Sequence, residues 1–176
     1  FFYLGLTRSM SVPNRQQALS NSRWVWVIRH AKAQNPAHTT DIERPLAAQG
    51  QTDSLHVGRQ LMEHRTAQII YTSGALRAFT TAKILGEVTG AKVVGRNELY
   101  ASTSEELLTT IQKIDKTIET TAIVAHNPGI SELANLLDQH QRPIILPPAG
   151  CIGFSYDGDW CDAHFDNFTR SIYFHP

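Results

Sequence analysis

The sequence predicts an α/β domain whose central sheet is mostly parallel, is flanked by helices on both faces, and carries an antiparallel hairpin near the C-terminus. Short apolar runs alternate along the chain with segments of helical spacing, which is typical of parallel sheets. The pattern changes after Pro147 and Pro148, where two extended segments surround the turn residues Asp157, Gly158 and Asp159. A length of 176 residues fits one compact domain.

The strands are predicted from short, continuous apolar runs rich in β-branched and aromatic residues, which indicate burial on both faces. These runs are residues 24–28, 69–71, 92–94 and 122–125. The two strands of the C-terminal hairpin are expected at residues 151–156 and 160–165.

The helices are predicted from apolar residues at helical spacing. They are residues 47–64, 76–88, 105–118 and 128–137. The apolar positions at helical spacing in the first two are Leu55, Gly58, Leu61 and Met62, and then Leu76, Phe79, Thr80, Ile84 and Val88. Ser104 is expected to cap the third helix, and Asn127 the fourth, with Pro128 in its first turn.

The composition argues against a nucleic-acid or membrane-surface protein. The 16 Lys and Arg residues balance the 16 Asp and Glu residues, so no large basic footprint is expected. A hydrophobic content of 41% excludes a disordered chain. The 11 arginines outnumber the 5 lysines, and arginine suits forked recognition of phosphate, so a small anionic ligand stays possible.

The predicted domain organisation is a mobile N-terminal arm or extension at residues 1–22, followed by a single domain at residues 23–176. No apolar run reaches the roughly 18 residues that a membrane helix needs. The apolar start makes a poor signal peptide because no basic region precedes it. Cys151 and Cys161 match neither a zinc site nor a redox pair, and free thiols are expected.

Basic side chains follow three of the predicted strands. Arg29 and His30 end the first strand, Arg77 follows the second, and His126 follows the strand at 122–125. Ligands of such sheets collect at the carboxyl ends of the strands, so these side chains are expected to converge. Arginines bind phosphoryl oxygens by charge-assisted hydrogen bonds, and a neutral imidazole can attack phosphorus. A second, protonated imidazole can stabilise the charge on phosphoryl oxygens.

This pattern resembles the histidine phosphatase superfamily, and within it the SixA-type phosphohistidine phosphatases. The resemblance covers residues 24–160, and its five pieces occur in order at similar spacing. The pieces are residues 27–33, Asp41 with 44–46 and Gly50, Ser73 with 77–78 and 81–82, residues 99–100, and residues 124–130. The resemblance implies a phosphoglycerate mutase-like fold and a phosphatase that needs no metal or other cofactor.

The resemblance also implies a role for each matching residue. His30 is the expected nucleophile, which becomes phosphorylated, and Arg29, Arg77 and His126 are expected around the phosphoryl group. Arg44 is expected to bind the phosphate, although it could instead anchor the loop through Asp41 or Glu43. Asn127 is expected at the substrate site, where it caps the following helix and orients His126. Lys32 is expected to be a solvated loop charge.

The general acid is the least defined part of this expectation. Many relatives use a carboxyl group to protonate the leaving oxygen, and Glu98 is the candidate, with Glu105 and Glu106 as weaker ones. The SixA-type branch looks like the part of the superfamily without an obvious acid. A phosphohistidine leaves as an imidazole and needs less help, so the absence of an acid would favour phosphoramidates over sugar phosphates.

The resulting hypothesis is a protein phosphohistidine phosphatase whose partner is a phosphorylated phosphotransfer protein. The first alternative is a phosphatase of small phosphorylated metabolites, with an acid such as Glu98. An alternative of another class is a non-catalytic module that binds phosphoproteins. A phosphoglycerate mutase is disfavoured because the chain is short. The resemblance and the lack of a targeting segment suggest a bacterial cytoplasmic setting.

Overall fold

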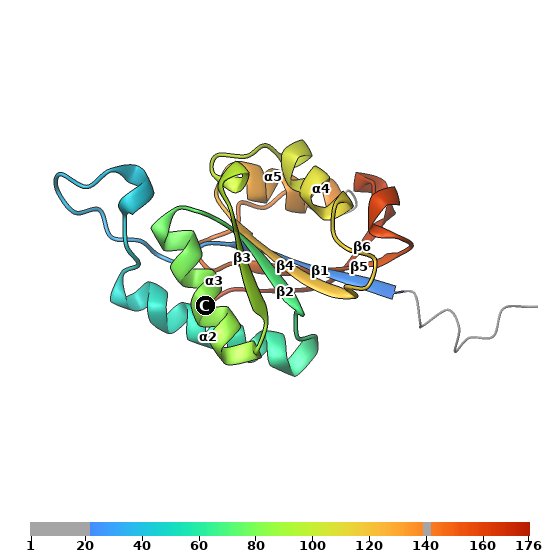
Figure 1. The fold of residues 1–176 in the computed structure, drawn as a ribbon, viewed down its shortest axis with the longest axis horizontal. Helices are drawn as coiled ribbons and strands as arrows, with labels where there is room; N and C mark the ends of the chain where they lie inside the picture. The colour runs from blue at the N-terminus through green and yellow to red at the C-terminus, as the bar shows by residue number, and fades with distance from the viewer. Residues whose placement is uncertain (1–21, 139–141) are drawn as a thin grey trace, which may run out of the picture.

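A computed structural model describes residues 22–138 and 142–176 of the chain (Figure 1). Its six-stranded sheet has the order β3-β2-β4-β1-β5-β6. The strands are β1 (Ser22–Arg29), β2 (Ile69–Ser73), β3 (Lys92–Arg96), β4 (Thr120–Ala125), β5 (Cys151–Asp157) and β6 (Phe168–Phe174). The first four are parallel, and β5 runs antiparallel to both of its neighbours. The predicted fold class is therefore confirmed.

Helices cover both faces of this sheet (Figure 1). α2 (Ala48–His64) and α3 (Leu76–Thr89) lie on one face, and α4 (Ser104–Gln112) and α5 (Gly129–Leu137) lie on the other. β1 shows why the sheet is apolar throughout, because its successive side chains enter two different cores. Val25 and Val27 pack in the core beneath α4 and α5, whereas Trp26 and Ile28 pack in the core beneath α2 and α3.

The buried face of α3 differs from the apolar positions that its spacing suggested. Leu76 and Phe79 are 43% and 40% exposed, and the helix buries Ala78, Ala82 and Leu85 instead. Small residues allow a close approach to α2, where a Cβ on Gly58 would lie 2.9 Å from that of Val88 on α3. Hydrophobic periodicity therefore misjudged which side of α3 is buried.

On α2, two of the four positions that were expected to form the apolar face are buried. Gly58 and Leu61 are buried, but Leu55 and Met62 are 42% and 55% exposed. The remaining buried positions of α2 are Gly50, Ser54 and Val57. Burial of a glycine and a serine leaves no hydrophobic signal, so the pattern could not locate this face.

α4 begins and ends at positions that local hydrogen bonds determine. Its N-cap is Thr103 rather than Ser104, because the Thr103 hydroxyl accepts from the Glu106 amide while the Glu106 carboxylate accepts from the Thr103 amide. The helix ends at Gln112 instead of near residue 118. Beyond it, the Asp115 carboxylate accepts from the Thr117 amide, and such a side-chain bond favours a turn over a continued helix.

The C-terminal hairpin is present, but its second strand lies later than predicted. Residues 160–165 are not a strand, because Trp160–Asp162 and Phe165–Asn167 form short 3₁₀ helices. Trp160 is 1% exposed, and its indole nitrogen donates to the Ile118 carbonyl at 2.7 Å. Burial of this side chain turns the segment into the core, so strand pairing resumes only at β6.

The sequence also predicted an N-terminal arm at residues 1–22 and two free thiols. The proposed arm at residues 1–22 lies outside the described residues, apart from Ser22, which begins β1. Cys151 is buried and Cys161 is exposed, and both are free thiols. In the described part of the chain, no helix has the length and apolar character to cross a membrane.

Candidate active site

The predicted site residues meet at the carboxyl ends of β1, β2 and β4, in a pocket of about 270 Å³. Its lining consists of Arg29, His30, Lys32, Ala33, Arg44, Arg77, His126, Asn127 and Pro148. Every expected residue except Glu98 is therefore brought together. Lys32, which was expected to be a solvated charge, is exposed but also lines the pocket.

His30 has one ring nitrogen held and the other directed at a basic neighbour. Its Nδ1 lies 2.8 Å from the Ala31 carbonyl, which can only accept, so Nδ1 carries the hydrogen and Nε2 keeps its lone pair. Burial, together with the nearby positive charges of Arg77, Arg29 and Arg44, lowers the pKa of His30 to about 4. His30 is therefore a neutral imidazole at neutral pH, as a nucleophile must be.

Arg77, in the first turn of α3, is the closest cation to this nitrogen. Its Nε lies 3.3 Å from His30 Nε2, and its side chain is 7% exposed. Its Nη2 donates to the Asp41 carboxylate at 2.9 Å, and its Nη1 donates to the Asp41 carbonyl. The guanidinium is thus fixed at its far end and faces the nucleophile with its near end.

His126 lies beside His30, with ring centroids 4.9 Å apart. Its Nε2 is 2.7 Å from the Ser73 hydroxyl oxygen, and that oxygen already accepts from the Ala75 amide. When the hydroxyl donates its hydrogen to Nε2, the ring hydrogen lies on Nδ1. Burial, followed by the charges of His30 and Arg77, lowers the pKa of His126 to about 3, so the second imidazole is neutral at neutral pH and not protonated as expected.

Two polar atoms on residues of the pocket lining are buried without a hydrogen-bond partner. One is Nδ1 of His126 and the other is Nε of Arg29. Arg29 is held at its other end, because its Nη1 donates to the Leu146 carbonyl at 2.8 Å. Unpaired buried donors carry a desolvation cost of about 1–3 kcal/mol each, which an anion bound in the pocket would relieve.

Arg44 fits both roles that the sequence left open. It lines the pocket, while its Nη1 contacts the Asp41 carboxylate at 3.2 Å and its Nε donates to the Gln34 carbonyl at 2.9 Å. Sequence reasoning missed the pairing of Asp41 with Arg77 and that of Ser73 with His126. The signal was present, since Asp41 and Ser73 both belong to the quoted motifs.

Asn127 does not cap α5, contrary to the expectation. The N-cap position is Pro128, and no side chain caps the helix there. Asn127 instead donates to the Leu146 carbonyl at 3.2 Å and accepts from the Ser131 hydroxyl. Its amide thereby ties the end of β4 to the segment that also holds Arg29.

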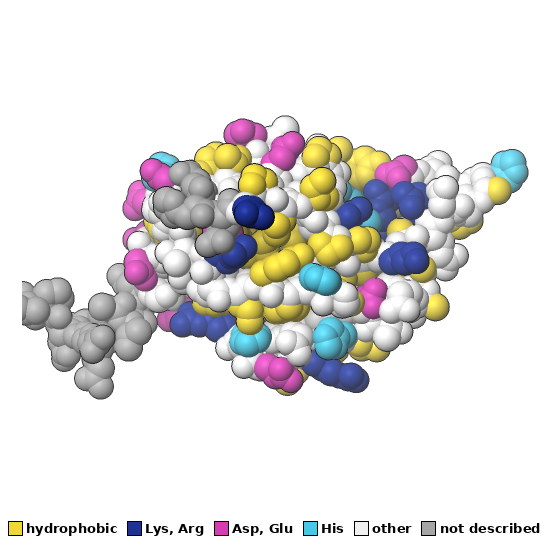
Figure 2. Space-filling view, turned by 180° about the vertical axis from the view of Figure 1, so that it is seen from behind, with side chains coloured by type: hydrophobic (Ala, Val, Ile, Leu, Met, Phe, Trp, Pro, Cys, Tyr) yellow, Lys and Arg dark blue, Asp and Glu magenta, His cyan; other side chains and the backbone are white. Residues whose placement is uncertain are grey.

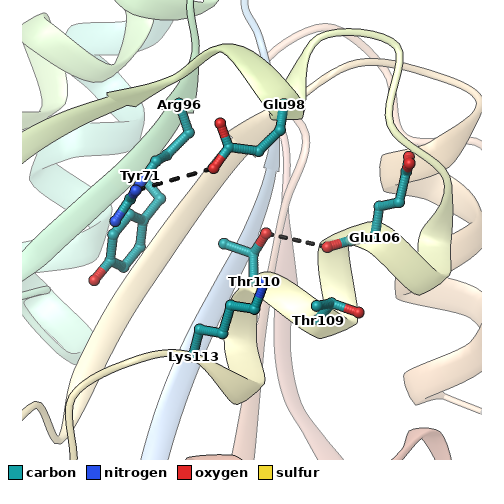
Figure 3. A pocket seen from close by; sticks show the side chains of 7 residues that line it. All are labelled: Tyr71, Arg96, Glu98, Glu106, Thr109, Thr110 and Lys113. Carbon is teal, nitrogen blue, oxygen red and sulfur yellow. Dashed lines mark hydrogen bonds and ion pairs between the residues drawn. The ribbon is translucent and has the colours of Figure 1, made fainter.

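The structure places Glu98 in a different pocket, of about 320 Å³, between the end of β3 and α4 (Figure 3). There its carboxylate points at Arg96, with 4.0 Å between Oε1 and Nη1. Glu106 belongs to the capping box of α4, and Glu105 accepts from the Ser104 hydroxyl. None of these three carboxylates lines the pocket of His30, and within residues 22–138 and 142–176 no acidic residue lines it.

Charged side chains are dispersed over the one face of the molecule that Figure 2 shows. On the face shown in Figure 2, Lys and Arg side chains occur as separate small groups on both sides of an apolar band.

Within residues 22–138 and 142–176, no three His, Cys, Asp or Glu side chains are grouped so that they could hold a metal ion. The polar side chains that line the pocket of His30 are two imidazoles, the Asn127 amide and basic side chains.

Comparisons with known proteins agree with this arrangement. The family model described as "Histidine phosphatase superfamily (branch 1)" matches residues 25–102, which include Arg29, His30 and Arg77. A comparison with curated proteins found no match. Among solved structures, the chain is similar to SixA from Nakamurella, with a TM-score of 0.74, 24% identity, and coverage of 88% of this chain and 96% of that one.

Two further solved structures are similar in fold to this chain. SixA from Agrobacterium tumefaciens is 22% identical, with a TM-score of 0.74 over 88% of this chain and 98% of its own. A mycobacterial glucosyl-3-phosphoglycerate phosphatase is 15% identical, with a TM-score of 0.61 over 86% of this chain and 98% of its own. The predicted resemblance is thus confirmed: residues 25–102 carry the sequence pattern of the histidine phosphatase superfamily, branch 1, on a chain with the fold of SixA.

Proposed function

We propose that this protein is a phosphatase in which His30 accepts a phosphoryl group and then yields it to water. The observation that carries the proposal is the surroundings of His30 Nε2. This unprotonated nitrogen lies 3.3 Å from the Arg77 guanidinium, in a pocket that three arginines line and no carboxylate enters. A dianionic phosphoryl group in this pocket would be surrounded by cationic side chains and would lie within reach of the nucleophilic nitrogen of His30.

The proposed reaction has two steps. The hydrogen bond from Arg77 Nε to His30 Nε2 is exchanged for one to a phosphoryl oxygen, and the freed lone pair of Nε2 forms a bond to phosphorus while the bond from phosphorus to the leaving group breaks. Water then attacks phosphorus, the bond to Nε2 breaks with its electron pair returning to the nitrogen, and phosphate leaves with both protons of the water, as dihydrogen phosphate. Arg77, Arg29 and His126 hold the phosphoryl oxygens in both steps, Arg29 and His126 through the donors that lack a protein partner.

The substrate we propose is a phosphohistidine on another protein, such as a phosphotransfer domain. Its imidazole departs neutral when the second ring nitrogen is protonated, so the step needs no acid from the enzyme. An alkoxide leaving group would need one, and the lining of the pocket supplies no carboxyl group. The likeness to SixA supports the same choice, while the mycobacterial glucosyl-3-phosphoglycerate phosphatase makes a small phosphorylated metabolite the second candidate.

The test measures phosphate release from a phosphohistidine phosphotransfer domain and, in parallel, from a panel of sugar phosphates. The variants are wild type, His30→Ala, and His56→Ala as a control on the exposed face of α2. We expect rapid loss from the protein substrate in wild type and His56→Ala, and none in His30→Ala. Turnover of sugar phosphates alone would favour the metabolite phosphatase.

A binding module would behave differently from either phosphatase. It would retain the phosphoprotein without releasing phosphate, and His30→Ala would leave that retention unchanged. Mass spectrometry of wild type after an acid-free quench with substrate examines the covalent step. A phosphoryl adduct on a residue other than His30 would refute the mechanism.

A further inference from the structure

The carboxylate of Asp41 is shared by side chains from three parts of the chain. Asp41 begins η2 (Asp41–Glu43), a single 3₁₀ turn on the long segment that reaches out between β1 and α2 (Figure 1). Arg77 comes from α3, Arg44 from the same segment, and Tyr100 from the turn after β3. Asp41 itself is 52% exposed in its side chain and does not line the pocket.

Asp41 holds the far end of the Arg77 guanidinium and leaves the Nε end facing His30. Asp41 accepts hydrogen bonds from both terminal nitrogens of Arg77. Its carboxylate accepts from Nη2 at 2.9 Å, and its carbonyl accepts from Nη1. Nε, at the other end of the guanidinium, faces His30 Nε2 at 3.3 Å. A guanidinium has five N–H donors, so two remain for phosphoryl oxygens after these three contacts.

Asp41 also fixes a second arginine and a neighbour of His126. Its Oδ1 lies 3.2 Å from Arg44 Nη1, and its Oδ2 accepts from the Tyr100 hydroxyl at 2.7 Å. The Tyr100 ring meets the ring of His126 edge-on, with centroids 5.6 Å apart. One carboxylate therefore connects two phosphate-facing arginines with the second histidine of the site.

The charge of Asp41 has its own effect on the site. Hydrogen bonds from Tyr100 and Arg77 hold the pKa of Asp41 far below its usual range, so its carboxylate is ionised at neutral pH. Asp41 is the anionic neighbour that offsets the mutual repulsion of Arg77 and Arg44. Its charge also acts to raise the pKa of His126, against burial and the nearby cations.

We propose that Asp41 is the positioning residue of the phosphate site, which orients Arg77 and Arg44 toward a phosphoryl group on His30. This inference rests on the proposed function. Asp41 acts through the arginines and does not touch the reacting atoms. A carboxylate that merely competed with substrate for the same arginines would have the opposite effect, because its removal would tighten anion binding.

The test compares Asp41→Asn with wild type and with Asp53→Asn, a control on α2 whose carboxylate accepts from Gln49. Calorimetry measures the affinity for tungstate and for inorganic phosphate, and steady-state kinetics gives kcat and KM. Because both arginines lose their orienting charge, we expect Asp41→Asn to bind either anion at least about tenfold more weakly, which is about 1.4 kcal/mol. KM should rise in parallel, while Asp53→Asn stays at the wild-type value. Tyr100→Phe, which keeps the carboxylate, should weaken binding in the same direction but less.

A double-mutant cycle with Arg77→Ala separates positioning from a general structural loss. If Asp41 acts through Arg77, most of the Asp41→Asn effect on anion affinity disappears in the Arg77→Ala background. Equal effects in both backgrounds, unchanged affinity, or tighter binding by Asp41→Asn would each overturn the inference. If wild type itself neither binds these anions nor releases phosphate, the proposed function fails as well. An active wild type with an unaffected Asp41→Asn refutes the positioning role alone.

Discussion

Acidification should inactivate the proposed phosphatase at a much lower pH than an ordinary histidine would allow. Burial and three arginines lower the pKa of His30 to about 4, so about 90% of His30 is still neutral at pH 5. A histidine with a pKa near 6.5 would be about 3% neutral at that pH. The acid limb of kcat/KM, which reports the free enzyme, should therefore have its midpoint near pH 4. His126, with a pKa of about 3, adds no limb above that.

The midpoint can be measured without a substrate whose own phosphate titrates. In ¹H–¹⁵N spectra of histidine-labelled protein, the signals lost in His30→Ala identify the two ring nitrogens. At neutral pH we expect a protonated Nδ1, bonded to the Ala31 carbonyl, and an unprotonated Nε2. Arg77→Ala should raise the midpoint, because the positive charge of Arg77 contributes to lowering the pKa of His30.

Three results would refute this reasoning. A midpoint near 6.5 would mean that burial and the arginines do not act on the ring as the geometry requires. A hydrogen on Nε2 would remove the lone pair from the nitrogen that faces Arg77. An unchanged or lower midpoint in Arg77→Ala would show that this guanidinium is not one of the charges that His30 senses.

Further predictions concern stability and the supports of the site. Because the folded protein keeps His30 and His126 neutral where an unfolded chain would protonate them, stability should fall as the pH drops below about 6.5, down to about pH 4 for His30 and about pH 3 for His126. The loss is up to about 1.4 kcal/mol per pH unit for each ring, and urea unfolding at several pH values in wild type and His30→Ala would measure it. In Gly50→Ala the new Cβ would lie 2.2 Å from the Lys32 carbonyl oxygen, so we expect a loss of about 1–3 kcal/mol in urea unfolding. A more stable variant would show that the loop yields freely. Ser73→Ala removes the hydroxyl bonded to His126 and should lower kcat/KM by about tenfold, with partial recovery in Ser73→Thr; equal activity would refute this support.

The sequence was sufficient to predict which side chains of the candidate site lie together, because the fold class determines where strand ends meet. β1, β2 and β4 are parallel neighbours, so the residues that follow them share one edge. His30, Arg77 and His126 could therefore be grouped before any coordinates were known. The hairpin and the C-terminal end of α4 were misplaced for a different reason. Trp160 is pulled into the core and Asp115 closes a turn, and neither effect leaves a periodic signal.

The side-chain partners in the site could not be predicted, because spacing does not show which way a loop residue faces. Glu98 follows β3, at the same edge of the sheet, yet it pairs with Arg96 and lines the other pocket. Asp41 lies within a long loop, and the path of that loop depends on the bridge between Ala33 and Leu46. The acid expected at the site is thus absent from its lining, and a carboxylate expected only as a possible loop anchor contacts its arginines.

The least predictable part of the site is backbone that contributes no reactive side chain. The Leu146 amide donates to the Ser131 hydroxyl, which donates to the Asn127 side chain, which in turn donates to the Leu146 carbonyl. This closed ring of hydrogen bonds fixes the same carbonyl that accepts from Arg29. The Leu146 carbonyl, more than a hundred residues away in sequence, binds Nη1 of Arg29 and thereby fixes the position of its Nε, which has no hydrogen-bond partner among the described residues. Asn127 thus holds the segment whose carbonyl contacts Arg29, although it caps no helix.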